Sequence, residues 1–447
     1  MQRITIEKLG PVSYFTTDVS QYVFLIGEQA VGKSTIAKSI YFCRNYKGIL
    51  REALYDIYNT GMYKGVVIKQ AKQFMQLLRS EVKAQFIEFF GYSWDLDRAM
   101  FLKYEFVPKQ VWLSIDLESQ QGYINLRNSK ELTRRINKLL AEVMNLYRNK
   151  YVTQDTIGLN SKERIRTQTL ISAKVNDIFE DYEETYYIPA GRSMLSLLSS
   201  GDVSSVRSSL DYITRQFVDI INSIRRYFNT GISSTEAIIT MSSDRRYQKA
   251  AGLIIDILKA DYYSTPDKDY IKIINRNGED FSITLNYASS GQQESLWLMN
   301  LIYVLFIRQE RSFVIIEEPE AHMYPVRQYK LLKYITYFAN ETGSNILITT
   351  HSPYCLTALN TLYVAGNKRL QSNSALRAKA EEILGGNYAV PSDKLQAYEV
   401  LSDGIQTLID ADEGELRTDK IDEVSKAILG EYLQIFELLE TNENDKD

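Results

Sequence analysis

The chain has few cysteines and histidines and no long apolar run. Its 447 residues include two cysteines, Cys43 and Cys355, which cannot make a disulfide framework, and two histidines, His322 and His351. No apolar run approaches the ~20 residues that cross a bilayer, and the N-terminal segment lacks the apolar region of a signal peptide. We therefore expect a cytoplasmic protein without a membrane segment.

The chain also lacks a strong net charge and a long heptad repeat. The net charge is −4, and the segment from Asp410 to Asp447 alone holds 13 acidic and 4 basic residues, so the remainder has a mild positive excess. Such an excess permits contact with nucleic acid without predicting it. Because no heptad pattern is long enough for an extended coiled coil, a long rod is not expected.

A phosphate-binding loop is predicted near the N-terminus. The stretch "YVFLIGEQAVGKSTIAKSI" reads as an apolar strand, a loop and a helix, and it fits G-x-x-x-x-G-K-[ST] from Gly27 to Ser34. Gly27 allows the tight turn, and Gly32 lets backbone amides approach phosphate oxygens at the start of the helix. Lys33 would reach the β- and γ-phosphates, Ser34 would offer its hydroxyl to Mg²⁺, and Thr35 belongs to the same phosphate-binding set.

A pair of glutamates ends the apolar strand "SFVIIEE". In P-loop enzymes, a carboxylate at the end of a neighbouring strand holds Mg²⁺, directly or through water. We expect Glu317 to take that role and Glu318 to orient and polarise the attacking water. Two carboxylates without partners at the end of a buried strand would be costly as structure alone, and Mg²⁺ and a water nucleophile supply such partners.

A helix and a further strand complete the set of motifs. The segment "NYASSGQQESLWLMNLIYVLF" has a small-residue turn at Ser289, Ser290 and Gly291, followed by an apolar helix whose start is a second anion-binding end. The strand "SNILITT" runs into His351. The motifs follow in the order phosphate loop, long gap, Ser-Ser-Gly helix, glutamate pair and histidine strand.

This order resembles the ATP-binding-cassette class of ATPases, which includes the heads of SMC and Rad50 proteins. The resemblance implies that Ser289, Gly291 and Gln292, with Ser290 in the same signature, contact the γ-phosphate of ATP bound to a second subunit. It also implies that His351 is the switch histidine. Because both histidines then lie within ATPase motifs, a separate histidine-dependent nuclease or zinc site is not expected.

Departures from that class point to a narrower group. "ASSGQQES" replaces the transporter-type signature, Glu317 replaces an aspartate, and "EEPEAHMYP" replaces the usual sequence that follows. These features look like the bacterial ATPases named after overcoming-lysogenization-defect (OLD) proteins, to which the Septu-, PARIS- and retron-associated antiphage ATPases are similar. The opening "ITIEKLGPVSYFT" and the segment "YYIPAGRS" also look like parts of that group. No glutamine is assigned to a Q-loop.

The expected fold is α/β, a P-loop ATPase head of the ABC/SMC type with a large, mainly helical insertion and a small C-terminal α+β tail. The expected parts are residues 1–58 with the phosphate loop, 59–264 as the insertion, 265–370 with the other motifs, and 371–447 as a hairpin–helix module. Two basic pairs in the insertion, Arg134–Arg135 and Arg225–Arg226, fit either contacts with nucleic acid or solvated helix faces.

The tail raises the alternative of a metal site. OLD-family nucleases carry a Toprim domain with an Asp-x-Asp motif, and "LIDADEGEL" contains Asp410 and Asp412. A Toprim domain needs roughly a hundred residues and a separate glutamate, which the tail does not accommodate. Asp, Ala and Gly also suit a hairpin turn, which is the interpretation that we favour.

The sequence thus predicts an ATPase that binds two Mg²⁺-ATP between two heads, as a homodimer or higher oligomer. The resemblance implies a regulator of an antiphage complex with a separately encoded nuclease. Two alternatives are a DNA-repair ATPase of the RecF or SMC kind that acts directly on DNA, and a nucleotide-locked scaffold with little turnover. Fold alone does not choose among them.

Overall fold

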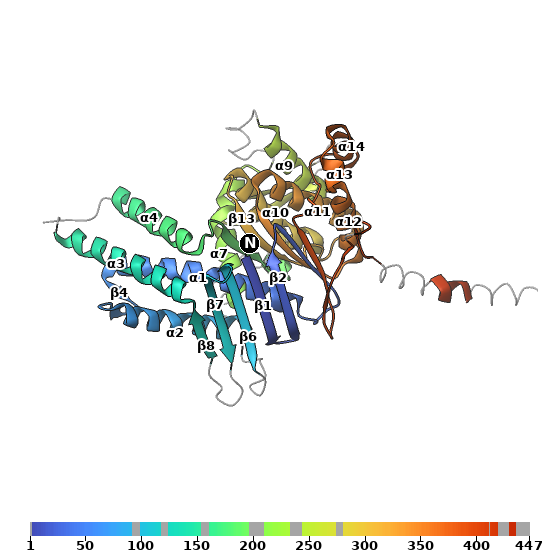
Figure 1. The fold of residues 1–447 in the computed structure, drawn as a ribbon. Helices are drawn as coiled ribbons and strands as arrows, with labels where there is room; N and C mark the ends of the chain where they lie inside the picture. The colour runs from blue at the N-terminus through green and yellow to red at the C-terminus, as the bar shows by residue number, and fades with distance from the viewer. Residues whose placement is uncertain are drawn as a thin grey trace, which may run out of the picture.

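A six-stranded sheet forms the centre of the molecule and carries the strands on which the motifs were predicted (Figure 1). Its strand order is β16-β15-β3-β14-β13-β9, and all neighbours are parallel except the β15–β16 pair. The computed structural model describes residues 2–91, 99–117, 124–152, 161–195, 210–232, 244–273, 280–410, 412–418 and 429–434.

The described strands fall into one central sheet, a five-stranded antiparallel sheet of order β2-β1-β6-β7-β8, a three-stranded sheet β10-β11-β12 and two small hairpins. Their bounds are β1 (Gln2–Leu9), β2 (Val12–Val19), β3 (Tyr22–Ile26), β4 (Met62–Tyr63), β5 (Val66–Val67), β6 (Met100–Val107), β7 (Val111–Leu117), β8 (Ile124–Asn128), β9 (Glu184–Ile188), β10 (Ala260–Ser264), β11 (Asp269–Ile273), β12 (Phe281–Thr284), β13 (Ser312–Glu317), β14 (Asn345–Thr350), β15 (Leu395–Val400), β16 (Ile405–Thr407), β17 (Ile409–Asp410) and β18 (Glu415–Leu416).

The described helices surround these sheets. Their bounds are α1 (Lys33–Thr60), α2 (Ala71–Phe90), α3 (Lys130–Val152), α4 (Ser161–Phe179), α7 (Tyr212–Ile224), α9 (Arg245–Leu258), α10 (Ser290–Ile307), α11 (Pro325–Thr342), α12 (Pro353–Ala365), α13 (Lys368–Gln371) and α14 (Ser374–Leu384), with 3₁₀ turns η1 (Arg192–Met194), η2 (Arg225–Phe228) and η3 (Leu285–Tyr287). None of the helices that the structure describes is both long and apolar enough to cross a membrane.

The central sheet is buried on both faces, which explains why its strands read as continuous apolar runs. Along β3, Phe24 joins a core that includes residues of α7, α9, α10 and α11, while the next residue, Leu25, joins a second core with α1, α2 and the antiparallel sheet. Alternate residues of a strand point to opposite faces, so one strand anchors both cores. The strand that leads into the phosphate loop is therefore held rigidly from two sides.

The middle of the chain is mainly helical, as expected, but it also contributes strands that the sequence analysis missed. Strand β6 pairs antiparallel with β1, and β7 and β8 extend that sheet. Strand β9 pairs with β13 at the edge of the central sheet. Strands from residues 59–264 therefore belong to sheets whose other strands lie outside this range. Their pairing partners are distant in the sequence, so no local pattern predicts them.

The C-terminal segment likewise shares the central sheet. Strand β15 is a parallel neighbour of β3, with Tyr398 opposite Leu25, and β16 continues the sheet. The four-part division of the chain stays a prediction, but its boundary at 370/371 does not separate two sheets. A hairpin, β17–β18, follows as expected, whereas most of the helix predicted after it lies outside the described residues.

Candidate functional site

The carboxyl ends of β3, β14 and β13 meet at one edge of the central sheet. Ile26, the last residue of β3, pairs with Thr350, and Glu317 at the end of β13 pairs with Thr349. Because these strands are parallel neighbours, the segments that follow them converge. The phosphate loop, the glutamate pair and His351 are thus assembled at one place, as their order along the chain predicts.

The phosphate loop depends on its two glycines. Gly27 has φ +155°, and a Cβ there would lie 2.2 Å from the carbonyl oxygen of Val400. Gly32 has φ +109°, a conformation that L side chains rarely adopt, and a Cβ there would lie 2.7 Å from Val12 Cγ2 in the β1–β2 hairpin. Neither position accommodates a side chain in this conformation, and the approach of the Gly32 backbone to phosphate oxygens stays a prediction.

Lys33 is the first residue of α1 and is buried within the loop. Its Nζ donates hydrogen bonds to the carbonyl oxygens of Gly27, at 2.8 Å, and Glu28. Burial lowers the pKa of Lys33, and the nearby carboxylates of Glu318, Glu320 and Glu28 oppose that shift. The lysine therefore shares an electrostatic environment with the glutamates that follow β13.

The next two residues lie in the first turn of the same helix. Ser34 is exposed and Thr35 is half-buried. A Cβ on Gly10, in the β1–β2 turn, would lie 3.7 Å from Thr35 Oγ1. Because the first amides of a helix have no intrahelical partner, the first turn of α1 offers donors for a phosphate beside the accessible hydroxyl of Ser34.

The two glutamates differ in their surroundings. Glu317 is 6% exposed, and its Oε2 accepts a hydrogen bond from the Ala190 amide at 3.3 Å. Its Oε1 is buried without a hydrogen-bond partner, which is costly unless a cation or a donor completes it. This orphaned oxygen fits an oxygen ligand for a hard cation such as Mg²⁺.

Glu318 is more open and sits on an unusual backbone. Its side chain is 35% exposed, and its Oε1 lies 3.6 Å from His351 Nδ1. Its φ is +43°, in the left-handed region that few non-glycine residues adopt. The Glu318 amide donates to the carbonyl of Thr349 at 2.9 Å. The backbone therefore turns sharply at Glu318, directly after the end of β13.

A third carboxylate, which the sequence analysis did not select, lies in the same site. Glu320 is buried, and its Oε1 accepts hydrogen bonds from Thr350 Oγ1 at 2.5 Å and from the His351 amide at 3.1 Å. The same oxygen lies 3.6 Å from His351 Nδ1, and Oε2 has no hydrogen-bond partner. His351 thus lies near two carboxylates, Glu318 and Glu320. Glu320 could have been found from the sequence, because it lies in the same segment, "EEPEAH", as the glutamate pair.

Glu320→Gln is expected to lower the turnover number for ATP hydrolysis roughly 10-fold with little change in ATP affinity. The amide keeps the size of the side chain but removes the charge that holds His351 and Thr350 in place, and small misplacements are expensive in catalysis. Steady-state kinetics and nucleotide titrations measure the two effects separately. A turnover number equal to that of the unsubstituted protein would show that Glu320 has no part in positioning.

The Ser-Ser-Gly segment begins α10 as predicted, but its glutamine is engaged within its own chain. Ser289 is the N-cap and forms a capping box with Gln292. Gln292 Nε2 also donates to the carbonyl of Leu258 at 2.9 Å. Ser289 and Ser290 are exposed, whereas a Cβ on Gly291 would lie 2.6 Å from the carbonyl oxygen of His322. Gln292 would have to release these bonds to reach a second subunit.

The other candidate residues have structural explanations. Arg134 and Arg135 both bind Glu131, and Arg225 pairs with Asp269, which favours their interpretation as internally neutralised residues. Asp410 Oδ1 accepts the amides of Asp412 and Glu413, as an Asx-type turn requires. Among the described residues, no group of three or more histidine, cysteine or acidic side chains could hold a metal ion.

Fold and site together define a P-loop ATPase. A family model described as "AAA ATPase domain" matches residues 1–356. The chain therefore belongs to the AAA ATPase-domain family and is an ATP-hydrolysing enzyme. Comparison with curated proteins found no match.

Several solved structures are similar at low identity. One is the SMC head domain from Thermotoga maritima, at 9% identity over 92% of this chain and 98% of that chain, with a TM-score of 0.36. A second is an SmcHead bound to the C-winged helix domain of ScpA, at 9% identity over 92% and 98% of the two chains and a TM-score of 0.35. A third is the Pyrococcus furiosus Smc head domain with an extended coiled coil, bound to the C-terminal domain of ScpA, at 9% identity over 96% and 100% and a TM-score of 0.38. Scores this low carry no argument about function.

Proposed function

We propose that two copies of this chain bind two Mg²⁺-ATP between their heads and hydrolyse them to switch a larger complex. The observation that supports this most directly is the exposed start of α10. Ser289 and Ser290 are accessible at the N-terminus of an 18-residue helix, whose dipole favours an anion. A second copy can present its bound nucleotide there.

Within one head, the proposed roles follow the surroundings of each side chain. Ser34 and the orphaned Oε1 of Glu317 would hold the Mg²⁺, which neutralises developing charge on the phosphates. Lys33 would exchange its bonds to loop carbonyls for bonds to phosphate oxygens. Glu318, more open than Glu317, would orient the attacking water. His351, lying 3.6 Å from Glu318, would respond to the state of the phosphate.

The biological setting that we propose is bacterial and cytoplasmic. By its resemblance to OLD-like ATPases, the chain would act as the sensor or regulator of an antiphage system whose nuclease is a separate protein. The nucleotide-dependent dimer would then control that nuclease. Direct action on DNA has less support, because three of the four candidate arginines bind carboxylates of their own chain.

Ser290→Arg is expected to abolish ATP-dependent dimerisation while leaving ATP binding by the single head intact. The added bulk and charge would block the exposed start of α10 and leave every residue of the phosphate loop unchanged. Ser374→Arg is the matched control, because Ser374 is also exposed and is also the first residue of a helix, α14. Light scattering on a sizing column, with and without Mg²⁺-ATP, measures the mass.

The proposal predicts a doubled mass with ATP in the unsubstituted protein and in Ser374→Arg, and an unchanged mass in Ser290→Arg. If the unsubstituted protein bound ATP and kept the mass of a monomer under all conditions, the dimer would be refuted. The effector part is tested by expressing the chain with the nuclease gene adjacent to it. Nuclease activity that does not respond to Glu318→Gln would contradict it.

A further inference from the structure

The Arg192 side chain is buried beside the catalytic glutamates. Arg192 is 1% exposed, and it begins η1 in the loop that follows β9. Its Nη1 donates to the carbonyl of Glu317 at 2.7 Å and to that of Pro189 at 2.7 Å. Its Nη2 donates to the carbonyl of Glu318 at 2.9 Å. One guanidinium therefore fastens both carbonyls that flank the Glu318 Cα.

These bonds act where the backbone is strained. Glu318 has φ +43°, and a non-glycine residue in so sparsely populated a region persists only where its surroundings fix it. The Thr349 carbonyl accepts the Glu318 amide, and the Glu318 carbonyl accepts the Ala321 amide at 3.2 Å. The guanidinium of Arg192 adds to this fixation by donating to the carbonyls on both sides of the Glu318 Cα. The direction in which the Glu318 carboxylate leaves the backbone thus depends on where Arg192 is held.

Arg192 is in turn held by the helix that begins with the Ser-Ser-Gly segment. Its Nε donates to the Glu294 carbonyl in α10 at 2.8 Å and lies 3.5 Å from the Glu294 carboxylate. That carboxylate accepts the Arg192 amide and the Ser193 amide, both at 2.9 Å. Burial lowers the pKa of Arg192, and the Glu294 charge is the largest influence that opposes it. Glu294 lies one turn after Ser290.

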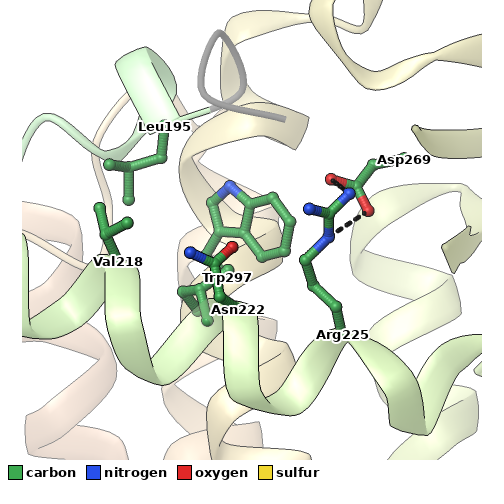
Figure 2. A pocket seen from close by; sticks show the side chains of 7 residues that line it. Leu195, Val218, Asn222, Arg225, Asp269 and Trp297 are labelled. Carbon is green, nitrogen blue, oxygen red and sulfur yellow. Dashed lines mark hydrogen bonds and ion pairs between the residues drawn. The ribbon is translucent and has the colours of Figure 1, made fainter. Parts of the chain in front are cut away.

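A residue shortly after Arg192 lies near α10 as well. Leu195 lines a small cavity with Trp297, Val218, Asn222 and Arg225 (Figure 2). Trp297 follows Glu294 by three residues on α10, so the two side chains lie on one face of that helix. The cavity has a volume of ≈ 20 Å³, and the Trp297 indole N–H has no hydrogen-bond partner. Leu195 and Trp297 belong to one hydrophobic core, so residues 192–195 lie against α10 beyond the Arg192–Glu294 pair.

We propose that the buried Arg192–Glu294 pair is a positioning device that couples the start of α10 to the direction of the Glu318 carboxylate. A nucleotide that binds to the start of α10 would shift Glu294. The Arg192 guanidinium, which holds the two peptide groups around Glu318, would shift with it. Contact with the second copy would then align the catalytic carboxylate. This coupling rests on the proposed dimer, because the nucleotide that contacts α10 is bound to the second copy.

An ordinary structural ion pair would give a different result. Breaking a buried pair destabilises a protein in any case, so loss of stability does not test the coupling. Arg44 provides the comparison, because it is 2% exposed and pairs with Asp181 at 3.1 Å, and it lies over Phe313 near the start of β13, away from the glutamates that end this strand. Arg44→Lys should lower the melting temperature without changing the turnover number.

The test uses Glu294→Gln and Arg192→Lys in a chain whose Trp297 is the sole tryptophan. Trp94→Phe and Trp112→Phe remove the other two tryptophans. Glu294→Gln keeps the shape and one acceptor oxygen and is therefore the milder change, so it provides the test if Arg192→Lys does not fold. The measurements are ATP affinity, the turnover number, and Trp297 emission on titration with Mg²⁺-ATP.

Both substitutions should lower the turnover number at least about 10-fold, change ATP affinity less than about 3-fold, and remove the change in Trp297 emission that ATP causes in the parent chain. Normal turnover and a normal Trp297 response in folded Glu294→Gln would overturn the coupling, and so would a parent chain that dimerises with ATP but shows no Trp297 response. A parent chain that binds ATP but stays monomeric would instead refute the proposed dimer.

Discussion

Lys33→Ala is expected to weaken ATP binding by roughly 100-fold or more, to the point where it is not detected at micromolar protein. Lys33 is the only side-chain cation within the phosphate loop, and hydrogen bonds to charged groups contribute about 1.5–3 kcal/mol each. Losing two of them corresponds to at least two decades in the dissociation constant. Isothermal titration with ATP and Mg²⁺ measures the effect.

Lys38→Ala is the control for that substitution. Lys38 lies on the same helix, α1, and is half-buried, but it is not part of the phosphate loop. We expect unchanged ATP affinity and a melting temperature close to that of the unsubstituted protein. An affinity for ATP in Lys33→Ala equal to that of Lys38→Ala would show that the loop is not the phosphate site.

Glu318→Gln is expected to keep ATP binding, to lower hydrolysis by about 10²-fold or more, and to accumulate the ATP-bound dimer. The amide is nearly isosteric with the carboxylate but can neither accept a proton nor polarise water through a full charge. Because the side chain is partly exposed, its substitution should not destabilise the fold. Single-turnover hydrolysis and mass measurements with ATP test the two consequences separately.

Glu317→Gln distinguishes the roles of the two glutamates. This substitution should lower hydrolysis and also raise the Mg²⁺ concentration needed for nucleotide binding, because the Glu317 Oε1 without a hydrogen-bond partner is the proposed cation ligand. Glu382→Gln, on an exposed residue of α14, controls for the chemistry of the substitution. Normal hydrolysis by Glu318→Gln would mean that the division of labour between Glu317 and Glu318 is wrong.

The motifs on parallel strands could be predicted from sequence because each is a local pattern. The strand before Gly27, the strand before Glu317 and the strand before His351 are short apolar runs that end in polar residues. The ends of parallel strands share one edge of a sheet, so the site follows from the pattern. Ile26 pairs with Thr350 and Glu317 with Thr349, so the three strand ends are neighbours, while the roles of the residues there stay predictions.

What the sequence did not predict depends on contacts between distant residues. Strands β6 to β8 complete a sheet with β1 across about a hundred residues, and no local pattern states that pairing. Arg192 reaches the glutamates from 125 positions away, and Glu320 acquires its meaning from Thr350 and His351. The engagement of Gln292 with Leu258 is equally invisible in the sequence.

The most direct test of the account is steady-state ATP hydrolysis by the purified chain, with and without duplex DNA, beside Glu318→Gln. The account predicts measurable turnover that depends on Mg²⁺, does not respond to DNA and is lost in Glu318→Gln. Turnover that DNA stimulates would favour an ATPase acting directly on DNA. Absent turnover despite ATP binding, or turnover that survives in Glu318→Gln, would contradict the catalytic site described here.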